Sequence, residues 1–383
     1  MSAALDSATE HQARPRVALS AALASGPSHA YLFRGPRGSG KRAAARAFAA
    51  EILAFRAEDP DDARRRALLD PSPHPDLVWL APRGAQHLVE EVRERVIRAA
   101  AYRPFEGGKR VFVVEAAEAM RDESQNALLK TLEEPPDFVH LILLSSEPEA
   151  LLETVASRCQ PIDFAPLPAA VLEVELAALG AGDPPASPDE IAAVARLAAG
   201  DLERAQLLLS GRGRELRAEA ERCVTAALDG TVATAPWRLL LDRAEAAGSD
   251  AEAATREALE EESSAGLKRT AREIGEESKR TGRRRSTEIL DLAFELCAVW
   301  LRDLAVLANG AGEVAFNRDR LAELRAQAAR VDPDSARRGA EIVQETRRGL
   351  DLNVSEELAF EALFFRLERT LSDAVTRRPR SPK

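Results

Sequence analysis

The sequence predicts a parallel α/β domain followed by domains built only of helices. Within residues 1–165, apolar runs typical of buried strands alternate with helical patterns, whereas strand patterns disappear after Phe164. Strands that alternate with helices usually form a parallel sheet joined by crossover helices. A glycine-rich segment at residues 35–42 follows the first apolar run and precedes the first helical pattern. That context is the one required of a phosphate loop, so we expect an α/β P-loop module with a parallel sheet flanked by helices.

Five apolar runs are predicted as strands. The runs at 111–114 and 139–144 are apolar throughout, as expected of strands buried on both faces of a parallel sheet. The other three strands are expected at 30–34, 77–80 and 161–164. Helices are expected between them at 41–53, 88–102 and 123–133.

Beyond residue 165, two further domains are predicted to be all-α. Residues 166–212 should form a small helical domain, with helices at 168–179 and 188–209. Residues 213–383 should form a larger one, because 288–307 and 358–371 carry apolar faces with a period near 3.6. The charge-dense segment 251–287 is open to two interpretations. We favour a solvated helix face or a mobile link over a contact surface for DNA or a neighbouring subunit.

Composition excludes several classes of function. The net charge of −10 makes the chain a poor lone binder of duplex DNA, and an aromatic content of 4% argues against a base-stacking platform. No apolar run is long enough to span a membrane, and residues 1–16 lack the order of a signal peptide, so a cytoplasmic location is expected. The three cysteines are scattered without a CxxC pair, which indicates neither zinc nor disulfides.

The phosphate loop departs from its pattern at the last position. A functional loop cradles phosphate with backbone N–H groups and a lysine, and a serine or threonine hydroxyl then binds Mg²⁺. Here that position holds an arginine, which has no lone pair for a metal. The candidate nucleotide-binding residues are Gly35, Pro36, Arg37, Gly38, Ser39, Gly40, Lys41 and Arg42.

A second departure from the ATPase pattern follows the strand at 111–114. Related ATPases end this strand with two acids, of which the first holds Mg²⁺ and the second activates water. Here the positions hold Glu115 and Ala116, and a methyl group cannot orient water. Two expectations remain open for the loop. It either binds ATP or ADP weakly with little Mg²⁺ dependence, or Arg42 fills the site through an ion pair with Glu115.

Two further positions are candidates for sensing or transferring charge. Ser145 and Ser146 close the strand at 139–144, where a polar group can sense a γ-phosphate. Arg158 precedes the last strand and is placed by the sequence at the mouth of the sheet. It is either an ordinary surface arginine or an arginine finger for a neighbouring active site.

Three motifs in this order resemble one family. His74-Pro75-Asp76, the helix Asn126-Ala-Leu-Leu-Lys-Thr-Leu-Glu-Glu-Pro-Pro136 and Ser157-Arg158-Cys159 are similar to those of clamp-loader subunits of the AAA+ class, above all the δ′-type subunits of bacterial DNA polymerase III. The resemblance is strong over residues 15–165 and weak beyond. The helix and the Ser-Arg-Cys triplet are the specific motifs.

The resemblance implies an AAA+ module at 1–165, a helical lid at 166–212 and a collar at 213–383 that assembles five subunits into a ring. It implies a non-hydrolysing, stator-like subunit whose Arg158 serves the ATP site of a γ/τ motor, with Arg204 in the position of a second sensor. The implied partners are γ/τ and δ subunits, and through the complex the sliding clamp and primer–template DNA. No membrane and no required cofactor are implied.

One departure and two alternatives accompany this resemblance. Many relatives carry a four-cysteine zinc module between the first helix and His74, but residues 54–73 contain no cysteine, so we expect a polar excursion and no zinc. The alternative function is an active γ/τ-type clamp-loader ATPase, which the intact Gly35–Lys41 favours and Arg42 and Ala116 oppose. A generic AAA+ nucleotide sensor outside replication is the third possibility.

Overall fold

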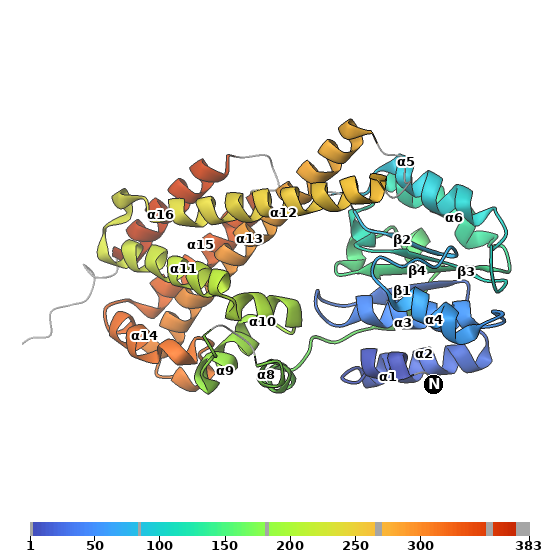
Figure 1. Ribbon diagram of the computed structural model, residues 1–383. Helices are drawn as coiled ribbons and strands as arrows, with labels where there is room; N and C mark the ends of the chain where they lie inside the picture. Colours follow the sequence, from blue (N-terminus) through green and yellow to red (C-terminus); the bar gives the residue numbers. More distant parts are fainter. Residues whose placement is uncertain (1–2, 83–85, 181–183, 265–269, 350–354, 373–383) are drawn as a thin grey trace, which may run out of the picture. The chain divides into compact units, whose positions relative to one another are not determined.

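The computed structural model describes residues 3–82, 86–180, 184–264, 270–349 and 355–372. The chain divides into two compact units, Met1–Pro168 and Ala169–Lys383 (Figure 1). The first unit ends close to the expected limit of the α/β module. The further division of the second unit at residue 212 stays a prediction.

The first unit is built on a five-stranded parallel sheet. Its strands are β1 (Ala30–Arg34), β2 (Leu77–Leu80), β3 (Arg110–Val114), β4 (Val139–Ser145) and β5 (Gln160–Asp163). They lie in the order β2-β3-β4-β1-β5, and every neighbouring pair is parallel. β3 and β4 are buried along their whole length, which explains their continuous apolar sequences. The predicted α/β class and all five strands are confirmed.

Helices cover both faces of this sheet, as Figure 1 shows for α1–α4 on one side and α5 and α6 on the other. Along β1 the side chains alternate, so Tyr31 and Phe33 enter one core while Ala30 and Leu32 enter the other. The first face carries α1 (Ala3–Ala8), α2 (Ala13–Ser25), α3 (Lys41–Ala54) and α4 (Pro60–Leu68). The second carries α5 (Val89–Glu91), the π-helix η1 (Val92–Arg98), α6 (Asp122–Glu133) and α7 (Glu153–Ala156), and the 3-10 turns η2 (Ala117–Ala119) and η3 (Pro148–Ala150) lie between strands and helices.

The polar excursion expected in place of the cysteine module is a charged helix, α4, which fills much of the segment 54–73. The Asp59 carboxylate begins the helix by accepting hydrogen bonds from the backbone N–H groups of Asp61 and Asp62, at 3.1 and 3.0 Å. Ala63 and Ala67 are buried against the rest of the unit.

The described residues of the second unit form helices and no strand. These are α8 (Ala169–Ala178), α9 (Pro188–Leu197), α10 (Leu202–Leu209), α11 (Gly211–Asp229), η4 (Val232–Thr234), α12 (Arg238–Ser264), α13 (Ala271–Ala308), η5 (Gly312–Val314), η6 (Arg318–Arg320), α14 (Leu321–Ala328), α15 (Pro333–Gly349) and α16 (Glu356–Ser372). The apolar faces predicted within 288–307 and 358–371 are buried, on α13 and α16 respectively. α13 packs against α11, α12, α14 and α15 and so forms the centre of this unit.

The single helix predicted at 188–209 is wrong: the chain forms α9 and α10 with a turn between them. Ala199 and Gly200 adopt left-handed conformations, with φ values of 52° and 91°. The Asp201 carboxylate then starts α10 by accepting a hydrogen bond from the backbone N–H of Arg204 at 3.1 Å.

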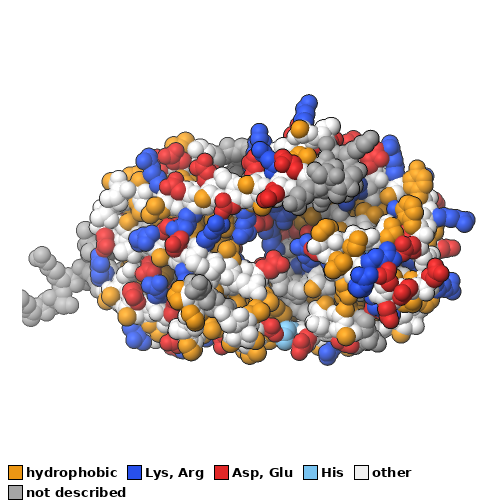
Figure 2. All heavy atoms as spheres, viewed as in Figure 1, with side chains coloured by type: hydrophobic (Ala, Val, Ile, Leu, Met, Phe, Trp, Pro, Cys, Tyr) orange, Lys and Arg blue, Asp and Glu red, His pale blue; other side chains and the backbone are white. Residues whose placement is uncertain are grey.

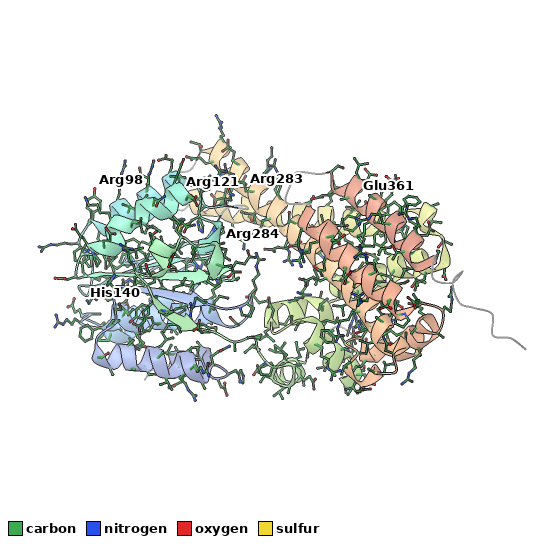
Figure 3. All side chains as sticks on the ribbon, turned by 180° about the vertical axis from the view of Figure 1, so that it is seen from behind. Arg98, Arg121, His140, Arg283, Arg284 and Glu361 are labelled. Atoms are coloured by element: carbon green, nitrogen blue, oxygen red, sulfur yellow. The ribbon has the colours of Figure 1, made fainter. Side chains whose placement is uncertain are left out.

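Where it is described, the charged segment 251–287 is helical and belongs to α12 and α13. The two helices cross very closely, because a Cβ added to Gly282 would lie 2.8 Å from the Gly248 carbonyl oxygen. Acidic and basic side chains lie side by side over α11 and α12 (Figure 2), and Arg283 and Arg284 project from α13 (Figure 3). Residues 265–269 of the segment lie outside the described ranges. The choice between a solvated helix face and a contact surface stays a prediction.

Among the helices of the described ranges, none combines the length and the apolar character needed to cross a membrane.

Candidate functional site

The phosphate loop connects β1 to α3 and is shaped by two glycines. Gly35 has a φ of 147°, and a Cβ at this position would lie 2.2 Å from the Phe164 carbonyl oxygen. Gly40, with a φ of 86°, precedes the first residue of α3. Only glycine accepts such conformations without strain. The loop therefore has the strand–turn–helix geometry that phosphate loops use.

Lys41 points back into the loop. Its Nζ donates hydrogen bonds to the carbonyl oxygens of Gly35 and, at 2.6 Å, of Pro36, and the residue is 8% exposed. These carbonyls therefore accept the hydrogen bonds that the Lys41 ammonium group would donate to a phosphate.

Arg42 forms the ion pair that was one of the two expectations from the sequence. Its Nε lies 2.7 Å from Glu115 Oε1 at the end of β3, and its Nη2 lies 2.9 Å from Asp70 Oδ2. The Glu115 side chain is 17% exposed, so its charge is partly withdrawn from water. A guanidinium thus neutralises the acid that would hold Mg²⁺ in an active site.

Trp79 of β2 and Arg46 of α3 complete this cluster. The Trp79 indole N–H donates to the same Glu115 oxygen at 2.6 Å, and the Arg46 guanidinium stacks 4.3 Å from the indole ring centroid. Burial lowers the pKa of Arg46, and the Asp70 carboxylate at 3.0 Å opposes that shift. The altered metal position is thus filled by the protein's own charges.

Ala116 lies next to this cluster in a left-handed conformation. Its φ and ψ are 46° and 56°, which is uncommon for a residue other than glycine. Its methyl group supplies no acid, and the turn directs the chain into η2. Both the chemistry and the backbone therefore depart from a water-activating position.

The two sensor candidates lie beside the loop at the end of β4. The Ser145 carbonyl accepts a hydrogen bond from the Gly35 N–H at 3.2 Å, and its hydroxyl accepts one from the Glu147 N–H at 3.2 Å. The Ser146 N–H donates to Glu118 Oε1 at 3.1 Å. The structure therefore brings Ser145 to the loop but ties both serines to neighbours within the protein.

Arg158 does not lie at the mouth of the sheet, and that expectation is wrong. It precedes β5, so it lies at the amino end of the strands, whereas the phosphate loop follows the carboxyl end of β1. Gln160, two residues after Arg158, is paired with Tyr31 near the start of β1. From Tyr31 to Gly35 the rise along the strand is about 13 Å. Arg158 is too far along the strands to serve its own loop.

Within its own unit, Arg158 is held by two acceptors. Its Nη2 lies 2.7 Å from Glu133 Oε1, and its Nη1 donates to the Thr154 carbonyl oxygen at 2.8 Å. The side chain remains 36% exposed. It is thus ordered yet accessible.

Arg204, the second sensor candidate, belongs to the other compact unit. On α10 it pairs with Glu295 Oε2 of α13, and Arg347 of α15 holds the other oxygen of Glu295 at 2.8 Å. The structure therefore engages Arg204 with the centre of its own helical unit.

The three cysteines are buried free thiols. Burial raises the pKa of Cys159 and of Cys297 to about 12, so neither is a reactive thiolate at neutral pH. The described residues also hold no group of three or more histidine, cysteine, aspartate or glutamate side chains placed to bind a metal.

Sequence reasoning missed four residues that shape these sites. Trp79, Asp70 and Glu133 carry no motif of their own, although Glu133 lies inside the motif helix at 126–136. Gln12 was also missed: its side-chain amide donates to the carbonyls of Ser39, at 3.0 Å, and Ala165, at 2.6 Å, which fastens the loop to the segment after β5. Gln12 is only 5% exposed, and the burial of this polar side chain, which the sequence does not reveal, would have been the signal.

Comparison with known proteins places these features in context. Residues 16–168 match the family model described as DNA polymerase III, delta subunit. The chain is 36% identical over 217 residues to the DNA polymerase III subunit δ′ of Pseudomonas aeruginosa, covering 55% of this chain and 64% of that protein. It is 34% identical over 176 residues to the subunit δ′ of Escherichia coli, covering 45% and 50%.

A third relative aligns over a longer part of the chain. The DNA polymerase III subunit γ/τ of Mycobacterium bovis is 30% identical over 348 residues, which cover 88% of this chain and 55% of that protein. The chain thus spans about half to two thirds of the length of these relatives. A solved γ subunit-related protein of Thermotoga maritima aligns over 93% of this chain and 99% of its own, with 15% identity and a TM-score of 0.41.

Proposed function

We propose that this chain, a relative of the δ′ subunits of DNA polymerase III, is a non-hydrolysing clamp-loader subunit that lends Arg158 to a neighbouring ATPase. The family model and the two δ′ relatives confirm the resemblance drawn from the sequence motifs. The observation that carries the proposal is the Arg42–Glu115 ion pair at 2.7 Å, which stands where an active site needs Mg²⁺.

Loss of hydrolysis follows from two separate features. Arg42 offers no lone pair to a metal and neutralises Glu115, and Ala116 offers no carboxylate to water. Phosphoryl transfer depends on the metal to neutralise charge on the transferring group. We therefore infer that nucleotide is not required, that ADP or ATP binds weakly with little Mg²⁺ dependence if the Lys41 contacts open, and that zinc plays no part.

The place of Arg158 supports action on a neighbour. It lies at the opposite end of the strands from its own loop, and it is half-exposed at the surface of its unit. A guanidinium offers a planar fork that can contact two phosphate oxygens. An arginine in this position can serve an adjacent subunit but not its own site.

Contacts within the second unit support a rigid, stator-like part. Arg196 of α9 donates to the Ala315 carbonyl at 3.2 Å, and Arg214 of α11 binds the Glu190 carboxylate of α9 through two nitrogens, at 2.7 and 3.1 Å. Arg204 joins α10 to α13. The three arginines hold the helices expected as a lid against those expected as a collar.

We infer that the partners are γ/τ-type motor subunits and a δ subunit in a hetero-pentamer. Through that complex the chain would act on the sliding clamp and on primer–template DNA in the cytoplasm. Its own net charge of −10 favours DNA contact through partners rather than alone.

The test is ATP turnover by a reconstituted clamp loader that contains Arg158→Ala. We expect DNA-stimulated turnover to fall by about 10³-fold or more at the served site, as for other arginine fingers, and Arg158→Lys to rescue it incompletely. Size-exclusion chromatography checks assembly, and Arg98→Ala, on η1, is the matched surface control. Wild-type turnover in an intact Arg158→Ala complex would show that Arg158 is only a surface arginine.

The alternative is an active γ/τ-type ATPase. The alignment with a γ/τ subunit over 88% of the chain and the intact glycine loop favour it. The isolated chain separates the two functions. We expect no ATP turnover above background, and a rate of about one per second, ordinary for an enzyme, would establish the alternative.

A further inference from the structure

The guanidinium of Arg158 is held between the last residue of one helix and the backbone of another. Glu133 is the last residue of α6, and Thr154 lies in the short helix α7, which ends two residues before Arg158. Their oxygens contact Nη2 and Nη1 at 2.7 and 2.8 Å. These two contacts engage both terminal nitrogens of the side chain.

The two acceptors differ in what they can do. The Thr154 carbonyl belongs to the backbone four residues before Arg158, so it is present whatever side chain position 154 carries. The Glu133 carboxylate is a charged acceptor, and a charge-assisted bond is stronger and more directional than a neutral one. Pro135 and Pro136 follow and stop α6 close to Glu133, so the carboxylate is presented from a fixed point.

A free arginine side chain samples many rotamers, and catalysis by a finger depends on placing the guanidinium accurately. The side chain of Arg158 is 36% exposed, so packing alone does not fix it. A guanidinium has five N–H groups, and contact with one carboxylate oxygen and one carbonyl leaves others available to a phosphate.

We propose that Glu133 is a positioning residue that preorganises Arg158 for the ATP site of the neighbouring subunit. This inference rests on the proposed function of Arg158 and adds a residue that acts only through it. Glu133 is argued to act only through its contact with Arg158, so its removal should slow phosphoryl transfer and leave ATP affinity unchanged.

The experiment is a double-mutant cycle in the reconstituted clamp loader. Glu133→Ala should lower kcat of DNA-stimulated ATP turnover about tenfold, with KM for ATP unchanged, because a misplaced catalytic group can cost up to about 10²-fold. Glu133→Gln keeps an oxygen acceptor and should recover most of the loss. The matched control is Glu134→Ala, an exposed neighbour on the same helix end, which should match wild type.

The double-mutant cycle separates the positioning role of Glu133 from the proposed finger role of Arg158. In the Arg158→Ala background, Glu133→Ala should add no further loss, because its only route to the reaction is gone. If Arg158→Ala lowers turnover but Glu133→Ala leaves it unchanged or raises it, the positioning role of Glu133 is wrong and the finger role of Arg158 stands. Additive losses in the double variant also overturn the positioning role.

If Arg158→Ala leaves turnover unchanged, the finger role of Arg158 is itself wrong. Assembly is checked by size-exclusion chromatography. Should Glu133→Ala assemble poorly, Glu133→Asp, whose shorter side chain withdraws the carboxylate from Arg158, takes its place in the cycle.

Discussion

Replacing Arg42 by threonine should convert the altered loop into one that responds to Mg²⁺. The change removes the guanidinium that lies 2.7 Å from Glu115 Oε1 and supplies the hydroxyl that the loop pattern lacks. Glu115 then keeps its hydrogen bond from Trp79 but becomes available to a metal through water. We expect the wild-type chain to bind ADP weakly and equally with and without Mg²⁺, and Arg42→Thr to bind it more tightly with Mg²⁺.

The size of the effect follows from the contacts that are lost and gained. Arg42 is 53% exposed, and its two ion pairs are each worth about 0.2–1 kcal/mol, so Arg42→Thr should cost about 1 kcal/mol of unfolding free energy. For a unit of this size that is a fall in Tm of about 2–4 °C. Mg²⁺ should tighten ADP binding to the variant about tenfold, or about 1.4 kcal/mol.

Calorimetric titration with ADP, with Mg²⁺ and with chelator, measures this difference. The matched control is Arg98→Thr, which breaks a surface ion pair with Glu94 at 2.6 Å on the same unit (Figure 3). It should leave the Mg²⁺ dependence unchanged. Mg²⁺-dependent binding by the wild-type chain, or none by Arg42→Thr, would refute the argument that Arg42 occupies the metal position.

Three further outcomes follow from backbone and burial. At the left-handed Ala116, the β-branched variant Ala116→Val should cost about 1–3 kcal/mol in urea unfolding, whereas Ala116→Gly should be tolerated. Gly282→Ala puts a methyl group 2.8 Å from the Gly248 carbonyl and should cost about 1–3 kcal/mol, while Gly275→Ala, in open space on the same helix, should gain about 0.5–1 kcal/mol in the same assay. Burial lowers the pKa of His140 to about 4, below its unfolded value, so stability present above pH 6.5 is lost as the pH falls toward 4; His140→Gln should remove about 2 kcal/mol of the loss measured between pH 7.5 and 5.

The centre of the sheet was predictable because β3 and β4 are buried along their whole length, whereas the edge strands β2 and β5 are partly exposed. Strands buried on both faces need continuous apolar runs, as β3 and β4 have. All five predicted ranges match β1–β5 within a residue or two at each end. α4 was not predictable in the same way, because only Ala63 and Ala67 are buried on an otherwise charged helix. The break after α9 was missed because a single glycine is tolerated inside a helical pattern, and only its left-handed neighbour Ala199 reveals the turn.

The candidate site was predictable where its residues sit in motifs. Arg42 and Glu115 flank a loop and a strand whose adjacency the fold class implies, so their ion pair was one of two expectations. Trp79 and Asp70 join them from other segments, and no local pattern marks either. Arg158 was assigned to the wrong end of the strands. It precedes β5, and because β5 runs parallel to β1 it lies at the amino end of the strands, whereas the phosphate loop follows the carboxyl end of β1.

A glycine in a phosphate loop can be required by the fold or by the bound phosphate, and the close approach of Gly35 to Phe164 shows that the fold alone requires it here. A side chain there would collide with the backbone that leaves β5, whether or not a phosphate ever enters the loop. Position 42, by contrast, is 53% exposed and accepts a long cation without disturbing the core. A side chain at position 35 is therefore costly for the fold itself, whereas position 42 tolerates replacement of the hydroxyl. The glycines of this loop therefore report its backbone geometry, whereas the residue after the lysine reports whether a hydroxyl is present to bind a metal.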